Sequence, residues 1–242
     1  MFTFDDIKLS VNEETYSKAC DIYESGKILS FKEDTHGFNA VVQGTERYNV
    51  EVSKAYYDSG TCDCYLGERD ILCKHMVAVA IYAIYRGKDI PIEQKEIIVR
   101  PRCSKRKGEL DKEQLALVKK QITNAKRYIK DYRGPSRKWF TYQDSLTEGV
   151  RRLSMIISEL PVSLQTAELL VSLLLKLDKR LSSGGVDDSD GTVGEFILET
   201  VSVLIEFSKI DPQVVKSFKK VIGVRTCFDW EGDLVVLYRL GT

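Results

Sequence analysis

The chain contains 242 residues, of which 43% are hydrophobic and 30% are charged, with 16 glycines and 5 prolines. This composition excludes collagen-like, low-complexity and largely disordered proteins, because it supplies enough apolar side chains for a packed core. No apolar run approaches the roughly 18 residues of a membrane span, and the first residues lack the basic and apolar regions of a signal peptide. We therefore expect a cytoplasmic protein without membrane contact.

The formal net charge is zero, but the charges are unevenly distributed along the chain. Residues 1–99 carry a net charge of −6, residues 100–138 a net charge of +10, and residues 159–211 a net charge of −6. A basic middle between acidic flanks is typical of a surface for a polyanion, and it is equally suited to holding the two halves of the chain together. Composition alone leaves both interpretations open.

The first ninety residues predict a small α+β unit. Asn12 is a typical helix cap and Gly26 a typical stop, so we expect a helix that ends at about Glu24. The short connections that follow contain glycine, which favours a meander of three strands: Lys27–Lys32, Phe38–Gln43 and Tyr48–Val52. The segment Met76–Tyr85 is apolar on nearly every side and predicts a buried helix that stops at Gly87.

The second half of the chain predicts a helical domain. Residues 88–108 read as a linker because they combine glycine, proline and a basic run. Long helical periodicity then predicts helices over 110–132, 136–159, 163–181, 192–209, 212–222 and 229–240. We therefore expect an N-terminal α+β domain over residues 1–99, and an all-α bundle or repeat-like domain with a basic N-terminal segment over residues 100–242.

One motif carries distinctive chemistry: Cys62, Cys64, Cys73 and His75 form the pattern C-x-C-x8-C-x-H. Three thiolates and one imidazole are the four donors that a structural tetrahedral zinc takes. A redox thiol cluster and unrelated core cysteines are the alternatives. Four ligands would close the coordination shell, so we expect no enzyme; a metal-assisted hydrolase would need an open position for water.

The motif and its surroundings resemble the SWIM zinc finger, as found in stand-alone prokaryotic SWIM proteins. The resemblance covers roughly residues 12–86 and includes the segments around Tyr16–Lys27, Val42–Thr45 and Tyr48–Val50, together with the entry of Cys73–Val79 into a helix. It implies that the four residues of the motif bind one structural Zn²⁺. It also implies a role in DNA binding or in protein–protein interaction.

Basic side chains following the motif form the candidate nucleic-acid contacts: Arg100, Arg102, Lys105, Arg106, Lys107, Lys119, Lys126 and Lys130. The last three recur near one face of a predicted helix, where they could follow a phosphate backbone of DNA or RNA. A solvated helix face and a charged linker would produce the same pattern. We therefore expect a zinc-binding interaction module whose partner is nucleic acid, a protein held by the helical domain, or both.

Three smaller expectations concern single side chains. Arg69 and Lys74 lie close to the motif and could screen its negative charge, donate to sulfur or simply be solvated. The acidic run Asp187–Asp190 lacks EF-hand ligands and is better suited to capping the following helix. Cys103 lies in the basic run, where we expect an exposed thiol with a lowered pKa.

Overall fold

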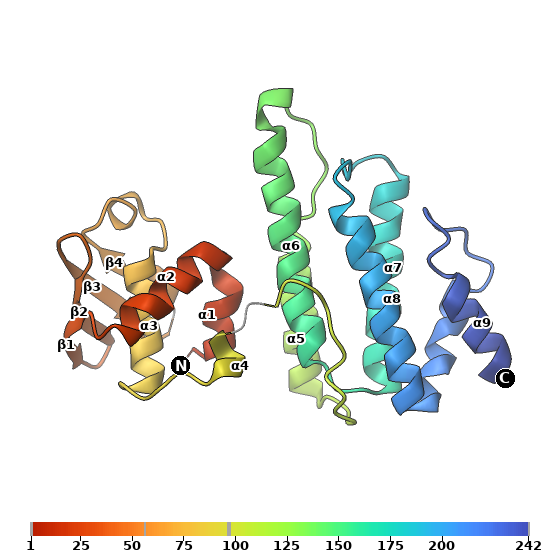
Figure 1. The fold of residues 1–242 in the computed structure, drawn as a ribbon, viewed down its shortest axis with the longest axis horizontal. Coiled ribbons are helices and arrows are strands. Elements are labelled where there is room, and N and C mark those ends of the chain that lie inside the picture. Colours follow the sequence, from red (N-terminus) through yellow and green to blue (C-terminus); the bar gives the residue numbers. More distant parts are fainter. Residues whose placement is uncertain (1, 56, 96–97, 242) are drawn as a thin grey trace. The chain divides into compact units, whose positions relative to one another are not determined.

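A computed structural model describes residues 2–55, 57–95 and 98–241. The chain divides into two units, Met1–Ile97 and Ile98–Thr242 (Figure 1). The first unit combines a small antiparallel sheet with helices, and the second is mostly helical, which confirms the predicted fold class. Within the described residues, no helix is both long and apolar enough to cross a membrane.

Two capped helices begin the first unit. Helix α1, Phe4–Ser10, is closed by a reciprocal capping box between Thr3 and Asp6, and the sequence analysis did not predict it. Helix α2, Glu13–Glu24, begins where the Asn12 side chain accepts the main-chain N–H of Thr15 at 2.9 Å, as predicted. The chain leaves α2 through Gly26, whose φ of +64° suits glycine.

The sheet is an antiparallel meander in the order β1-β2-β3-β4. Its strands are β1 Ile28–Glu33, β2 Gly37–Gln43, β3 Arg47–Ser53 and β4 Thr61–Cys62. The first three confirm the predicted meander. Strand β4 has only two residues, too few to show an alternating pattern in the sequence, and it forms because Cys62 pairs with Val50 on β3.

Helix α3, Lys74–Tyr85, forms the centre of the first unit. It packs against α1 and α2 on one side and against the sheet on the other, so Val77 to Ile81 are completely buried (Figure 1). The chain that follows includes the short helix α4, Ile92–Lys95. It is tied to α2 because the Tyr16 and Tyr23 hydroxyls donate to the carbonyls of Gln94 and Lys88, at 2.8 and 2.6 Å.

Long helices build the second unit (Figure 1). These are α5 Lys112–Ala125, α6 Trp139–Glu159, α7 Leu164–Ser182 and α8 Thr192–Ile210, followed by α9 Gly232–Gly241. Short 3-10 helices cover Ser136–Lys138 and Pro212–Val221. The core between the helices is apolar and fully buried, as at Leu146, Leu153, Leu170, Leu174 and Phe207.

The predicted helix over residues 110–132 was wrong at its C-terminal end. From Arg127 to Ile129, the amides bond three residues back instead of four, and the helix ends. Side chains of α6 and α7 then take up the carbonyls that the helix would have used: Ser145 donates to the carbonyl of residue 128, Tyr142 to that of residue 130, and Arg180 to those of residues 126 and 129. These donors lie far along the chain, so local periodicity does not reveal the end of α5.

Two further expectations for the second unit also need correction. The predicted helix over residues 212–222 is a 3-10 helix, and the one over 229–240 begins only at Gly232, after Asp229 with its φ of 52°. Residues 101–108 are not a free linker. Arg102 N–H donates to Ser158 Oγ at 3.0 Å, Ser104 Oγ donates to a carbonyl at 2.6 Å, and Pro101 is buried, so this segment packs along the end of α6.

Candidate metal centre

The first two cysteines of the motif are positioned by the edge of the sheet. Cys62 lies in β4, and Cys64 follows in a turn that is tied to β3 through the intervening Asp63. The Asp63 carboxylate accepts the main-chain and side-chain N–H groups of Asn49 at 2.9 and 2.8 Å. With β4 only two residues long, these bonds help to hold the C-x-C pair in place.

Gly67 allows the loop after the cysteines to fold closely onto them. A Cβ at this position would lie 2.1 Å from the carbonyl oxygen of Cys62, so a larger residue would force the loop away. The Gly67 N–H donates to Cys64 Sγ at 3.4 Å, which stabilises negative charge on that sulfur. This role of Gly67 was not predicted, and the glycine in the loop between the two halves of the motif is the sequence signal for it.

The other two ligands come from the start of α3. Cys73 is the residue at the N-cap position and makes no side-chain capping bond, which leaves its sulfur directed at the cluster. His75 lies in the first turn of α3, and both side chains are buried, with 1% and 3% of their surface exposed. The helix therefore fixes the C-x-H pair as the sheet fixes the C-x-C pair.

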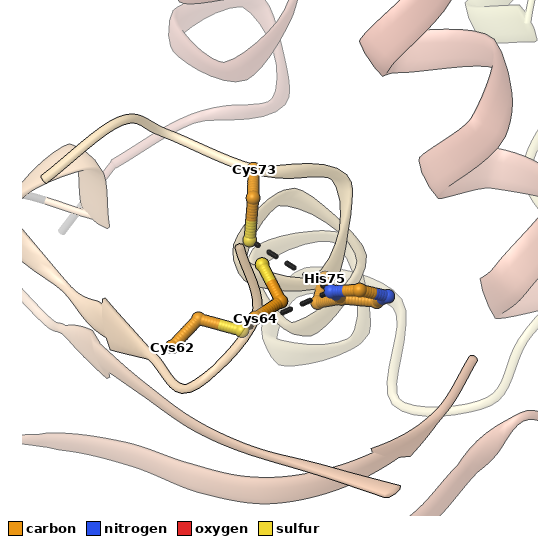
Figure 2. A group of neighbouring side chains, drawn as sticks. All are labelled: Cys62, Cys64, Cys73 and His75. Carbon is orange, nitrogen blue, oxygen red and sulfur yellow. Dashed lines mark hydrogen bonds between the residues drawn. The ribbon is translucent and has the colours of Figure 1, made fainter. Parts of the chain in front are cut away.

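The four side chains converge on one point, and Figure 2 shows the three sulfur atoms and the imidazole turned toward one another. Their ligand atoms all lie within 4.8 Å of one another. His75 Nδ1 lies 3.8 Å from Cys62 Sγ and 3.9 Å from Cys73 Sγ. Sulfur and nitrogen bound to one tetrahedral zinc lie about 3.6 Å apart, so the spacing fits one shared metal ion with Nδ1 as the ligand nitrogen.

The thiols are coupled in a way that suits metal binding. The neighbouring thiol of Cys62 lowers the pKa of Cys73 to about 4, against the opposing effect of burial. In turn, the proximity of Cys73 and burial raise the pKa of Cys62. The cluster thus favours one thiolate before any metal arrives, and the thiolate is the form of cysteine that binds metal.

The imidazole of His75 is held on two further sides. Tyr48 stacks on it with ring centroids 4.5 Å apart and an interplanar angle of 26°. A Cβ at Gly44 would lie 2.9 Å from its Nε2, and this buried nitrogen has no hydrogen-bond partner among the described residues. Packing thus contributes to holding the ring with Nδ1 toward the sulfurs.

The charged residues Arg69 and Lys74 lie close to the motif in the sequence, and one role considered for them was donation to the cysteine sulfurs. Arg69 stacks over the Tyr65 ring at 3.5 Å and donates to the Tyr65 carbonyl at 2.8 Å, so it is engaged with its own loop. Lys74 lines a hollow of about 410 Å³ beside the centre, together with Lys18 and Tyr48. The loop acids Glu68 and Asp70 are exposed.

The structure disperses the eight predicted nucleic-acid contacts over several environments. Arg100 pairs with Glu199 at 3.1 Å and Arg106 with Glu159 at 2.9 Å, so acidic side chains of the same unit neutralise part of the basic run. Lys105 and Lys107 are exposed, as is the side chain of Arg102.

The stripe of three lysines on one helix was wrong, because α5 ends before it is complete. Lys119 and Lys126 line one groove of the second unit, whereas Lys130 lies beyond the end of α5 and lines a different hollow.

The structure also bears on the expectations for Cys103 and for the acidic loop before α8. Burial raises the pKa of Cys103, contrary to the predicted lowering. Asp188 accepts the Val193 and Gly194 N–H groups at 2.8 and 2.9 Å, which confirms that the acidic loop caps a helix.

Comparison with known proteins confirms the resemblance for one part of the chain. The family model described as SWIM zinc finger matches residues 56–84, a segment that contains all four residues of the motif. No curated protein and no solved structure matches the chain. Residues 56–84 are therefore similar to the SWIM zinc finger, a zinc-binding module, and Cys62, Cys64, Cys73 and His75 are positioned to hold one metal ion.

Proposed function

We propose that this protein is a non-enzymatic, cytoplasmic binding module, in which one structural zinc ion organises the first domain and basic side chains of the second bind DNA or RNA. Residues 1–99 are the zinc domain and residues 100–242 the helical domain. In this proposal Cys62, Cys64, Cys73 and His75 are the zinc ligands.

The closed metal centre supports a structural role for the zinc. Three sulfurs and one nitrogen fill a tetrahedral shell, which leaves no position for a reactive water. The acids of the loop between Cys64 and Cys73, Glu68 and Asp70, are exposed, and Asp63 is engaged by Asn49. A metal-assisted hydrolase is the alternative, and it would require one of the four ligands to leave the ion.

The observation that carries the proposal is a set of lysines without an acidic partner. Within the described part of the chain, no ion pair is formed by five of the eight predicted contacts: Lys105, Lys107, Lys119, Lys126 and Lys130. Cations without partners keep their charge available for phosphates, whereas Arg100 and Arg106 share theirs with Glu199 and Glu159. Contacts of this type do not read bases, so we expect weak sequence preference.

A purely protein-binding scaffold is the second candidate, and apolar side chains near the C-terminus favour it. Phe228, Val236 and Leu240 are 47%, 54% and 80% exposed. Large apolar side chains at a surface are typical of protein interfaces when they gather in one patch. This candidate predicts binding that depends on these side chains and little on salt.

Fluorescence-anisotropy titration of the zinc-loaded chain against single- and double-stranded DNA and RNA tests the proposal. We expect the logarithm of the affinity to fall linearly with the logarithm of the salt concentration, and binding to weaken in Lys105→Gln/Lys107→Gln. The control variant Lys27→Gln/Lys32→Gln removes two exposed lysines of the first unit. Weak binding that responds to neither salt nor the basic residues would refute nucleic acid as the partner and favour the scaffold.

A further inference from the structure

The second unit contains a groove of about 540 Å³ between α5 and α7. Its walls combine Lys119 of α5 and Lys126, the residue that follows α5, with Lys176 of α7, and the 3-10 helix over Pro212–Val221 adds Lys220. Lys176 and Lys220 lie 38 and 82 residues beyond the end of the predicted basic segment at residue 138, so only the fold places them beside it.

Hydrogen bonds at both ends hold the groove in shape. At one end, the Gln165 side chain accepts the Leu110 N–H at 3.1 Å and donates to the Leu110 carbonyl at 3.2 Å. At the other end, Arg180 of α7 donates to the carbonyls of Lys126 and Ile129. The two helices therefore run in the same direction, with their separation set by the chain itself.

The lining of the groove carries an excess of positive charge. It contains four lysines and one acidic residue, Glu168, for a net charge of +3. Glu168 lies 3.9 Å from Lys220, so it compensates at most one of the four cations. Lys119 and Lys126, the C-cap of α5, are seven residues apart, which separates their attachment points by about 10.5 Å along the helix axis.

These cations also lie close enough to repel one another. Lys126 is half-buried, and its pKa is lowered first by burial and then by the charges of Lys176 and Arg180. Holding like charges together in a partly desolvated groove costs free energy, and a bound anion would relieve that cost. The arrangement therefore favours an occupant that carries negative charge.

The neutral side chains of the groove narrow the chemistry of that occupant. The hydroxyls of Thr123 and Ser172 donate to carbonyls of their own helices, at 2.8 and 2.7 Å, and Gln165 is engaged by Leu110. Among the described residues that line the groove, none is aromatic, so bases find no stacking surface there. Lysine ammonium groups are thus the principal donors left for a ligand, and they suit phosphate oxygens.

We propose that this groove holds phosphodiester groups of a nucleic-acid single strand, with Lys119 and Lys126 on one wall and Lys176 and Lys220 on the other. The proposal rests on the proposed function and locates part of its binding surface. A groove of this size corresponds to sites that enclose one small ligand, so it admits a few nucleotides of one strand and not a duplex.

The test compares Lys176→Gln/Lys220→Gln with a matched control, Lys179→Gln/Lys219→Gln. The control removes two exposed lysines from the same two elements, outside the groove. Binding of a labelled single-stranded 20-mer to the zinc-loaded full chain is measured by anisotropy between 50 and 200 mM salt. Circular dichroism and Tm show whether each variant keeps the fold.

We expect the groove variant to bind the strand at least several-fold more weakly at low salt, with a salt slope that is smaller by about 1.4, while the control stays within about twofold of the wild type. Equal binding by the two variants, with the wild type still bound, would overturn the groove and leave the proposed function standing. No nucleic-acid binding by the wild type would refute the proposed function itself.

Inorganic tripolyphosphate provides the second arm of the experiment, because free oligophosphates offer the same oxygens. We expect it to compete with the strand only at concentrations well above that of the oligonucleotide. Tight binding of tripolyphosphate that requires Lys176 and Lys220, without binding of any strand, would overturn the nucleic-acid assignment of the groove.

Discussion

Replacing Cys73 by serine removes one of the four metal ligands and tests what the metal centre stabilises. Between Lys54 and Cys73, the only buried side chains among the described residues are the three cysteines. This segment therefore has no apolar core of its own. By contrast, α2, α3 and strands β1 to β3 share a core that includes Phe38 and Val52, both completely buried.

The size of the effect follows from this division. Structural zinc in finger peptides contributes on the order of 10–16 kcal/mol, so an even share for one of four ligands is roughly 3 kcal/mol, or on the order of 100-fold in metal affinity. The β4 pairing and the Asn49–Asp63 hydrogen bonds, each worth about 1 kcal/mol net, are already formed in the zinc-bound state, so they do not make up for that loss. We expect the segment around residues 57–73 to open while the rest of the first unit stays folded.

Hydrogen–deuterium exchange of the Cys73→Ser variant, with zinc content measured alongside, checks this expectation. Amides of residues 58–72 should lose protection, and those of α2 and α3 should keep most of theirs. Cys20→Ser is the control, because it removes a buried thiol of the same unit that lies outside the cluster. Unchanged zinc content and unchanged protection of residues 58–72 in Cys73→Ser would refute the reasoning.

Two further substitutions test close contacts of the fold. Gly67→Ala places a Cβ against the carbonyl of Cys62, so we expect a lower zinc affinity in a chelator competition. Gly232→Ala is the control, because a Cβ there would meet nothing within 4 Å, and it should leave the zinc affinity unchanged. Equal zinc affinities of the two variants would contradict the close packing at Gly67. Asp178→Ala removes a carboxylate, 6% exposed, that accepts the indole N–H of Trp230 at 2.9 Å and a main-chain amide nearby. It should lower the free energy of unfolding in urea by about 2–4 kcal/mol, and a change below about 0.5 kcal/mol would show that these donors find other partners.

The metal ligands and the main elements of the first unit were accessible from the sequence, because they depend on near neighbours. A C-x-C and a C-x-H pair each present two donors within three residues, whatever the rest of the chain does. Likewise, Asn12 caps α2 through a residue three positions away, and Gly26 ends the helix with a local change of φ. Capping and periodicity depend on residues close together in the chain, so the sequence predicts them without knowledge of the tertiary structure.

The contacts that hold the metal ligands in place could not be predicted from the sequence in the same way. Tyr48 stacks on His75 across 27 residues of chain, and Gly67 matters only because the loop returns to the carbonyl of Cys62. Strand β4 exists because β3 offers it a partner, not because two residues carry a strand pattern. Each of these contacts depends on where the chain returns in space.

The charge pattern shows the same division. The sequence by itself determined that residues 100–138 are strongly basic, but it did not determine which of those charges are available. The tertiary structure pairs Arg100 and Arg106 with acids of the same unit, ends α5 before the lysine stripe is complete, and places Lys176 beside Lys126. Electrostatic and hydrogen-bonding partners separated by 50 to 100 residues meet only in the folded chain, and for that reason the fold alone decided where the positive charge is concentrated.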